Sequence, residues 1–425
     1  MARLFICLNI FFILLATTTS LTEHNPKPKP RPKQKPHAFI LPVFKDTKTG
    51  IYYTNVTVGK PSLVVNLAVD VRGSALWFQC EEIGYNSTTY TPILCGSKGC
   101  EQTKDQCSTC MGTYGPSCRN DTCHAYLQTQ MTYNRVQASL VKDDVVLSYT
   151  SPSTKLTARL PLACMLASEV VAGLPYGTQG ILGLGNSSTS FVTALVSSYK
   201  IPFKVALCLP SNPGNDSGTV YIGGGRLPPR GKDVRGLLVS TPLVSIPETR
   251  EHGEDNYYID VKSIEVNGKK LSFNQDLLTF NKTSHYGGTK ISNIIPYTLL
   301  DSSIYKALVE AFAGKAKKRK AMYPFSDCFS YKSFGGKSLL GEETPVISLV
   351  LGGAAKWDIY GPNSLVKVRK TVLCLAFVDA GESPRIPIEI GGYQMEDNLV
   401  EFDLDGSKFS FTSSLLRHNT SCSQL

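Results

Sequence analysis

The sequence predicts a mostly β protein with a few short helices, arranged as two lobes. Short apolar runs with period-two alternation recur between glycine and proline residues, as in IYYTNVTVG at 51–59 and YYIDVKSIEVNG at 257–268. The 425 residues suffice for two lobes, each with a core of its own. The halves also echo each other weakly, since GILGLG at 180–185 has a counterpart in IPIEIGG at 386–392, which indicates a tandem β duplication.

Four segments are expected along the chain. Residues 1–21 have the pattern of a secretory signal peptide, because a cation precedes an apolar stretch that closes in small residues and is too short to span a bilayer. Residues 22–37 form a basic, proline-rich leader, a composition typical of extended chain. An N-terminal β lobe over 38–232 and a C-terminal β lobe over 233–425 complete the chain.

One amphipathic helix stands out in DSSIYKALVEAFAGKAKKR at 301–319. Its apolar residues recur at i, i+3 and i+4, and either Asp301 or Ser302 can cap its first turn. The stripe consists of Ile304, Ala307, Leu308, Ala311 and Phe312.

Cysteine usage indicates an oxidising compartment. Once Cys7 leaves with the signal peptide, an even number of cysteines remains, which predicts six disulfide bonds. A zinc knuckle around the C-x-x-C pair Cys107 and Cys110 is the alternative. The twelve residues are Cys80, Cys95, Cys100, Cys107, Cys110, Cys118, Cys123, Cys164, Cys208, Cys328, Cys374 and Cys422.

Glycosylation is expected because the mature chain is rich in N-x-S/T sequons, several of which should carry glycans on the surface of a secreted protein. The acceptor residues are Asn55, Asn86, Asn120, Asn186, Asn215, Asn281 and Asn419.

The net charge of +10 is partly local to the leader. Weak contact of that leader with acidic wall polysaccharide is one expectation, and a plain solvated leader is the other. The remaining basic residues show no aromatic interleaving, so no nucleic-acid partner is expected.

Six segments stand in the order and spacing of plant aspartic proteases of the pepsin fold. They are NLAVDVRGSALWFQC, GILGLG, GTVYIGGG, GGTKIS followed by YTLLDSSIYKALVEAF, FSDCF, and IEIGGYQMEDNLVEFDLDGSKFSF. The chain resembles in particular the plant branch that holds xylanase inhibitors, extracellular dermal glycoproteins and basic seed globulins, and it looks most like xyloglucan endoglucanase inhibitor proteins. The resemblance covers about 38–422 and implies a bilobal, pepsin-like double β-barrel.

The same resemblance implies a protein without proteolytic activity. Pepsin-type catalysis needs two carboxylates that share one proton, each on a D-[TS]-G loop. Asp70 fills the place of the first aspartate, but Val71 and Arg72 follow it. At the second loop Ser292 stands where the aspartate is expected, and Asn293 where the hydroxyl residue is expected. Asp70 and Ser292 are therefore expected to be relic positions.

Other chemistry finds little support. Asp301 is nine residues too far along the chain to be the second acid, and its place before an amphipathic stripe predicts a helix cap. The segment that matches the substrate-covering hairpin, TYNRVQASL at 132–140, has no glycine, so a mobile flap is not expected. No cluster has ligand spacing, so neither metal nor cofactor is expected, while a Ser-His-Asp triad stays open.

A secreted β scaffold without catalysis suits binding through its loops. The resemblance implies inhibition, in plant defence, of a microbial xyloglucan-specific endoglucanase or endoxylanase. Such enzymes hold two carboxylates in an open cleft, about 5–5.5 Å apart if retaining, and a guanidinium can bind a carboxylate through two hydrogen bonds.

Two arginines are the expected inhibitor-binding residues. Arg319 in GKAKKRKAMYPFSDCF and Arg385 in FVDAGESPRIPIEIGG match loops whose arginines enter the glucanase cleft in dermal-glycoprotein-like inhibitors. A bridge between Cys328 and Cys374 is expected to hold the strands near both loops in one frame. The alternative is that the cations at 317–320 are only the solvated end of a helix.

Two rival functions stay open: a residual aspartic endopeptidase, and a storage or ligand-binding basic globulin. The protein is expected to be a monomer in the apoplast or cell wall. Its expected partner is a microbial glycoside hydrolase, with no membrane partner.

Overall fold

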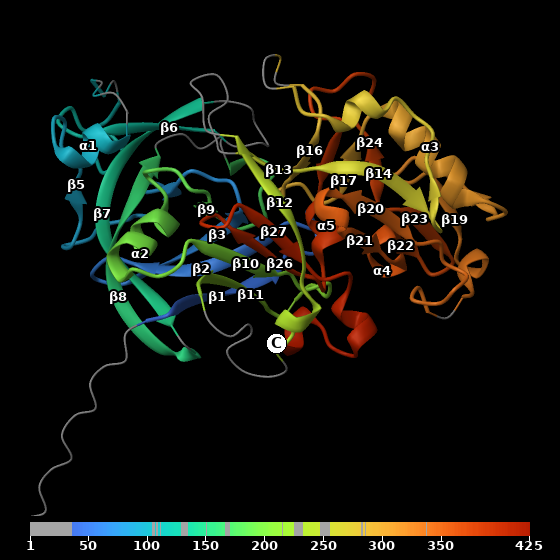
Figure 1. The fold of residues 1–425 in the computed structure, drawn as a ribbon. Coiled ribbons are helices and arrows are strands. Elements are labelled where there is room, and N and C mark those ends of the chain that lie inside the picture. Colours follow the sequence, from blue (N-terminus) through green and yellow to red (C-terminus); the bar gives the residue numbers. More distant parts are fainter. Residues whose placement is uncertain are drawn as a thin grey trace, which may run out of the picture. The chain divides into compact units, whose positions relative to one another are not determined.

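The alternating runs become strands in the computed structural model. It describes residues 36–425 apart from 104–106, 108, 111, 129–134, 150, 166–170, 215, 225–232, 247–255, 282, 283, 285 and 337. The predicted signal peptide, nearly all of the leader, and sequon residue Asn215 lie outside the described residues. The mostly β fold class is confirmed (Figure 1).

Strands of the first half pair mainly with one another. They are β1 (Ala38–Lys45), β2 (Tyr52–Val58), β3 (Leu63–Asp70), β4 (Leu76–Gln79), β5 (Thr91–Pro92), β6 (His124–Gln128), β7 (Arg135–Tyr149), β8 (Ser151–Met165), β9 (Gly180–Gly183), β10 (Lys204–Cys208) and β11 (Gly218–Gly223).

Strands of the second half are shorter. They are β12 (Val239–Ile246), β13 (Asn256–Ile259), β14 (Val261–Val266), β15 (Lys269–Lys270), β16 (Thr289–Ile291), β17 (Thr298–Leu300), β18 (Lys318–Arg319), β19 (Cys328–Ser330), β20 (Ile347–Leu351), β21 (Lys356–Ile359), β22 (Leu365–Arg369), β23 (Val372–Leu375), β24 (Phe377–Asp379), β25 (Ile388–Ile390), β26 (Leu399–Asp403) and β27 (Lys408–Phe411).

The described helices are short. The α-helices are α1 (Lys98–Thr103), α2 (Phe191–Tyr199), α3 (Ser302–Ala313), α4 (Gly361–Ser364) and α5 (Gly392–Met395). Short 3-10 turns are η2 (Arg235–Leu237), η3 (Gln275–Leu278), η4 (Tyr331–Phe334), η5 (Gly352–Ala354), η6 (Leu415–His418) and η7 (Cys422–Gln424). No helix in the described part of the chain is long and apolar enough to cross a bilayer.

Sequence alternation explains the burial in β2, where Val56 and Val58 face the core and Asn55 points to solvent. β2 pairs antiparallel with β3, and β3 runs parallel to β9, which places Asp70 opposite Gly183. The last four residues of β3 are buried, as expected of a strand covered on both faces.

One sheet joins the two halves of the chain. β10 pairs antiparallel with β26 from Lys204 opposite Asp403 to Cys208 opposite Leu399 (Figure 1). The Nζ of Lys204 lies 2.7 Å from the carboxylate of Asp403 at the end of this pairing. The predicted boundary at 232/233 falls at the edge of an undescribed stretch, and the two-lobe division stays a prediction.

Helix α3 confirms the amphipathic pattern but ends earlier than the cationic run. The Asp301 carboxylate accepts a hydrogen bond from the Ser303 N–H at 2.8 Å, so Asp301 is the N-cap. Gly314 ends the helix at a φ of +48°. Ala311 is exposed, and Tyr305 and Val309 complete the buried face in its place.

Six disulfide bonds occur among the described residues. The C-x-x-C pair Cys107 and Cys110 does not form a zinc knuckle, because Cys107 forms a disulfide with Cys95 and Cys110 forms one with Cys118. The pairs are Cys80–Cys164, Cys95–Cys107, Cys100–Cys123, Cys110–Cys118, Cys208–Cys422 and Cys328–Cys374.

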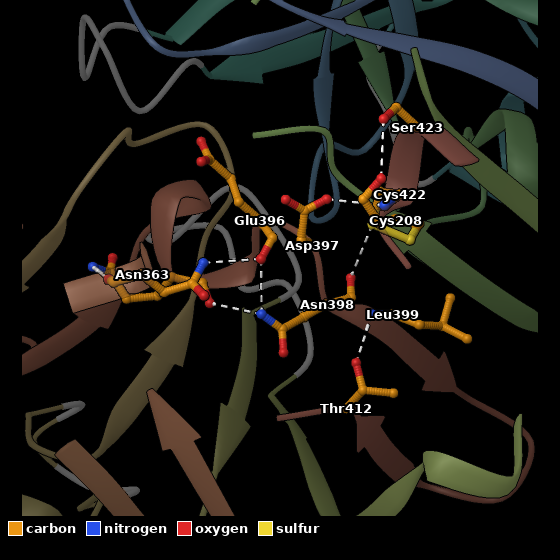
Figure 2. Close-up of a disulfide and its surroundings, with 11 residues drawn as sticks. Cys208, Asn363, Glu396, Asp397, Asn398, Leu399, Thr412, Cys422 and Ser423 are labelled. Carbon is orange, nitrogen blue, oxygen red and sulfur yellow. Dashed lines mark hydrogen bonds between the residues drawn. A yellow bond between two sulfur atoms is a disulfide. The ribbon is translucent and has the colours of Figure 1, made fainter. Parts of the chain in front are cut away.

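The Cys208–Cys422 disulfide ties β10 to the C-terminal turn, and Figure 2 shows the polar groups around it. The Asp397 carboxylate accepts a hydrogen bond from the Cys422 N–H at 2.9 Å. The side chains of Asn363 and Asn398 both donate to the backbone carbonyl of Glu396, each at 2.9 Å. These bonds hold the chain after α5 in place.

Candidate functional site

Asp70, the predicted first relic position, is a buried carboxylate at the end of β3. Asp70 is 1% exposed, and its Oδ1 accepts a hydrogen bond from the Arg72 N–H at 3.0 Å. Its own carbonyl accepts from the Leu184 N–H at 2.8 Å. A Cβ at Gly183 would lie 2.3 Å from the Gly73 oxygen, so the glycine of GILGLG lets the Asp70 loop pack against β9.

The two loops of the site are joined by an amide side chain. Asn293 is fully buried, its Oδ1 accepts from the Val71 N–H at 2.9 Å, and its Nδ2 donates to the Val69 carbonyl at 2.7 Å. Where the protease family places a small hydroxyl, an amide here makes both bonds to the opposite loop. The side chain of Val71 has no polar atom, so the side-chain link between the loops comes from Asn293 alone among these two residues.

A second carboxylate, absent from the residues predicted for the site, lies beside Ser292. Glu389 on β25 and Lys290 on β16 are opposite each other in parallel strands. Their Oε1 and Nζ atoms lie 3.0 Å apart, with the two side chains 15% and 10% exposed. The side chain of Ser292, which is fully buried, hydrogen-bonds to this carboxylate.

The surrounding charges keep Glu389 ionised. Burial alone would raise the pKa of its carboxyl, but the cations of Lys290 and Arg72 outweigh that effect and hold the pKa below the ordinary glutamate value. Tyr258 lies opposite Lys290 on the neighbouring strand β13. Burial raises the pKa of Tyr258 to about 12, against the lowering effect of Arg385 and Arg72.

This arrangement is unsuited to sharing a proton. A pepsin-type dyad needs one carboxyl that stays protonated because a like charge lies next to it. Glu389 is instead stabilised as an anion by Lys290 and Arg72. A signal for the pair was present in the sequence, because Lys290 and Glu389 are each the one charged residue in an apolar strand.

Arg319 lies in a strand instead of at the end of a helix. It is exposed in β18 and pairs with Cys328 of β19, and Cys328 in turn lies opposite its disulfide partner Cys374 of β23. The interpretation of 317–320 as a helix end is therefore wrong, because Gly314 terminates α3 before it.

The hairpin that follows Arg319 has a defined tip. Met322 and Phe325 exchange backbone hydrogen bonds of 3.1 and 2.8 Å, which leaves Tyr323 fully exposed at the turn. The ring of Phe325 packs edge-on against that of Tyr297 at 4.7 Å between centroids. The disulfide and this ring contact support the base of the hairpin.

Arg385 lies on a different element, the loop between β24 and β25. The residue is exposed, and its backbone carbonyl accepts a hydrogen bond from the Gly287 N–H at 3.0 Å. Asp301 fixes the same loop, because its second oxygen accepts from the Ser383 N–H at 3.1 Å. The Asp301 carboxylate thus caps α3 and also orders the Arg385 loop.

The other predicted positions are placed as follows. Of the segment 132–140 that matches the substrate-covering hairpin, residues 132–134 lie outside the described residues, and 135–140 belong to β7. Of the described sequon asparagines, Asn186 is half-buried, and the exposed ones are Asn55, Asn86, Asn120, Asn281 and Asn419.

Two family models match the chain. The model described as xylanase inhibitor N-terminal matches residues 52–224, and the one described as xylanase inhibitor C-terminal matches 256–413. Among curated proteins, the "Probable aspartic proteinase GIP2" of Nicotiana benthamiana is 34% identical over 406 residues, 91% of each chain. "Gamma conglutin 1" of Prunus dulcis is 33% identical, covering 99% of this chain and 95% of its own.

Solved structures agree with these relatives. EDGP superposes with a TM-score of 0.84 at 33% identity, covering 92% of this chain and 98% of its own. Basic 7S globulin from soybean superposes with a TM-score of 0.79 at 28% identity, covering 92% of this chain and 99% of its own. The aspartic proteinase from Irpex lacteus superposes with a TM-score of 0.58 at 14% identity, covering 90% of this chain and 99% of its own. That last likeness concerns the fold alone, and the pepsin-like fold class is confirmed.

Proposed function

Because the chain belongs to the xylanase-inhibitor family of aspartic-protease-like proteins, we propose that it binds and inhibits a secreted microbial glycoside hydrolase. The family and its EDGP and conglutin relatives support an aspartic-protease-like protein without catalysis. The finer statements are ours: the target is a xyloglucan-specific endoglucanase or an endoxylanase, and the protein acts outside the plant cell or in its wall.

The loss of proteolysis rests on one observation, the ion pair between Glu389 and Lys290. Ser292, which we infer to occupy the place of the second catalytic aspartate, carries a hydroxyl that does not ionise at neutral or acid pH, so it cannot exchange a proton with Asp70 as a carboxyl group would. The neighbouring Glu389 carboxylate is held as an anion. Asp70 therefore lacks a partner that could alternate between acid and base, as peptide hydrolysis requires.

Recognition is assigned to the two exposed arginines. Arg319 and Arg385 each stand on a segment held by backbone hydrogen bonds, with Cys328–Cys374 behind the first and the Asp301 carboxylate behind the second. The backbone on such a support loses little freedom when the loop binds, so the ordering cost is largely that of the arginine side chain. A carboxylate pair in a hydrolase cleft offers it charge-assisted, two-point hydrogen bonds that are strongest where water is excluded.

The proposal is tested by titrating the purified protein against secreted fungal and oomycete xyloglucanases and xylanases and measuring residual hydrolysis. We expect stoichiometric inhibition of at least one enzyme, reduced about 100-fold or more by Arg385→Ala and Arg319→Ala together, since arginine hot spots are worth about 2–4 kcal/mol or more. Arg369→Ala, an exposed arginine on β22, is the matched control.

Two outcomes would contradict parts of this proposal. Inhibition that survives both substitutions would refute the arginine mechanism. Failure to inhibit any enzyme, together with failure to cleave peptides, would favour a storage or ligand-binding globulin, as the seed globulin relatives suggest. The oligomeric state is expected to be monomeric in both cases, measured by light scattering.

A further inference from the structure

A small pocket lies far along the chain from the arginines, in the disulfide-rich part of the first half. Its volume is about 220 Å³. Two of the disulfides, Cys100–Cys123 and Cys110–Cys118, cross-link the segment that forms one wall. The lining residues are Tyr85, Asn86, Ser87, Tyr90, Tyr114, Gly115, Pro116 and Arg119.

Two of the lining tyrosines, Tyr85 and Tyr90, are fixed by contacts with neighbouring side chains and backbone. Tyr85 is 5% exposed, packs edge-on against Phe78 at 5.2 Å and donates its hydroxyl to the buried Asp143 carboxylate. Tyr90 lies 6.3 Å from Tyr85 between ring centroids and donates to the Pro116 carbonyl at 3.2 Å. Their ring orientations are therefore set before any ligand arrives.

The rim carries an exposed aromatic ring and a cation. Tyr114 is 69% exposed, and the guanidinium of Arg119 lies 5.1 Å from its ring centroid. Asp121 holds Arg119 from the other side, with 3.2 Å between Nε and Oδ1. Gly115 and Cys118 exchange backbone hydrogen bonds of 3.1 Å each, which fixes the turn between Tyr114 and Arg119.

Aromatic faces with a few polar groups at the edge suit a sugar ring. The axial C–H groups of a pyranose pack on tyrosine faces, while its hydroxyl and acetamido groups take hydrogen bonds from guanidinium and amide groups. A fatty or purely apolar ligand would offer the Arg119 guanidinium no acceptor.

The chain supplies such a ring at the pocket itself. Asn86 lines the pocket and is the acceptor of the sequon Asn86-Ser87-Thr88, whose first and third residues are exposed. Hydrogen bonds fix this turn: Ser87 Oγ accepts from the Lys60 N–H at 2.9 Å, and Thr88 Oγ1 donates to the Lys60 carbonyl at 3.1 Å. A glycan on Asn86 would begin at the wall of the pocket.

We propose that this pocket is a sugar subsite that holds an N-acetylhexosamine ring, supplied by the chain's own glycan on Asn86. A free N-acetylhexosamine oligosaccharide presents the same chemistry, and the experiment separates the two sources. The seated glycan covers Tyr114 and Arg119 and shields its own linkage from enzymes.

The test uses the full chain secreted by a eukaryotic host. The native protein is digested with peptide N-glycosidase, and glycan release at Asn86 and at the exposed Asn419 is followed by mass spectrometry. We expect release about tenfold slower at Asn86, equivalent to about 1.4 kcal/mol of protection, and equal rates after denaturation and reduction. Tyr114→Ala should abolish the difference, whereas Tyr126→Ala, an exposed tyrosine on β6 outside the pocket, should leave it unchanged.

A second arm covers the free-sugar source. The Asn86→Gln protein is titrated with N,N′-diacetylchitobiose and followed by NMR, alone and with Tyr114→Ala added. Saturable binding that Tyr114→Ala removes, without protection in the first arm, assigns the subsite to a free oligosaccharide. Equal release at Asn86 and Asn419 in the native protein, combined with no chitobiose binding, overturns the sugar subsite.

Discussion

At the scale of single residues, Asn293 joins the chain next to Ser292 to the chain around Asp70. Its amide oxygen accepts a hydrogen bond from the Val71 N–H while its amide nitrogen donates one to the Val69 carbonyl. A serine or threonine hydroxyl would have to make both bonds through a single oxygen atom. Both partners are buried backbone groups of the loop that carries Asp70. The amide therefore positions this loop without contributing an acid.

Replacing Asn293 with alanine should lower the free energy of unfolding by about 2–4 kcal/mol, because a buried N–H and a buried carbonyl would each lose their partner. Chemical denaturation measures the change. Asn212→Ala, at an exposed asparagine that bonds to Asp216, is the control and should change stability by less than about 0.5 kcal/mol. A loss below about 1 kcal/mol at Asn293 would show that water replaces the amide.

The ion pair beside Ser292 has a clear pH signature. Lys290→Met should lower the free energy of unfolding by about 3 kcal/mol near neutral pH. Glu389 would stay charged but would keep only Arg72 as a counter-charge. A carboxyl whose folded pKa is lowered stabilises the fold above its unfolded pKa, and that contribution is lost as pH falls through the folded value.

The difference in the free energy of unfolding between wild type and Lys290→Met should therefore shrink below about pH 4. Urea unfolding from about pH 7 to about pH 3 measures it. Adding Glu389→Gln to Lys290→Met should recover part of the lost unfolding free energy at neutral pH, since no buried carboxylate then remains without its lysine. A difference that stays constant over this pH range would contradict the assigned charge states.

One half of this site has a signal in local motifs, and the other half does not. The assignment of Asp70, Ser292 and Asn293 to the two protease loops rests on such motifs and stays a prediction. The partnership of Lys290 with Glu389 depends on the register of two parallel strands about a hundred residues apart, which no local pattern specifies. A lone charge inside an apolar strand was the available clue.

At the scale of elements, the hairpin after Arg319 is stiffened by its core-facing ring. Phe325 is 5% exposed and packs on Tyr297, whereas Tyr323 at the tip is fully exposed.

The periodicity that predicts α3 is local, but it does not show where the helix ends. The alanines and lysines after Gly314 are themselves good helix formers, so the pattern continues past the true end of α3. β18 forms there because Cys328 and Phe329 offer a strand to pair with.

Phe325→Ala should loosen this hairpin while leaving Arg319 in the chain. We expect trypsin to cleave after Lys320 about tenfold faster, since about 1.4 kcal/mol of lost local stability multiplies the open population by ten. Tyr323→Ala, which removes an exposed ring from the same turn, should leave the cleavage rate unchanged. Equal rates in all three proteins would mean that the ring contact does not order the hairpin.

At the scale of the whole described fold, a buried carboxyl joins the two halves of the chain. Glu396, just after α5, forms an ion pair with Lys45 of β1 and accepts a hydrogen bond from the Tyr52 hydroxyl of β2 at 2.5 Å. Burial raises the pKa of Glu396 to about 7, an effect that Lys45 opposes in part. The contact therefore changes its charge state between acid and neutral conditions.

A raised carboxyl pKa means that the folded chain holds a proton that the unfolded chain has released. The free energy of unfolding should therefore fall as pH rises from about 4.5 to about 7, by about 3 kcal/mol for this group. Glu396→Gln should flatten the profile over that window, and Glu310→Gln, on the exposed face of α3, should not. A wild-type profile that rises with pH there, and is unchanged by Glu396→Gln, would contradict this assignment.

The absence of a proton-sharing pair at Asp70 is tested most directly by a peptide-cleavage assay on the purified protein from about pH 3 to about pH 7, with and without pepstatin. We predict no turnover above that of the buffer at any pH, and no difference between wild type and Asp70→Asn. Cleavage at acid pH that pepstatin blocks and Asp70→Asn abolishes would show that a working dyad exists, and would contradict a protein that acts by recognition alone.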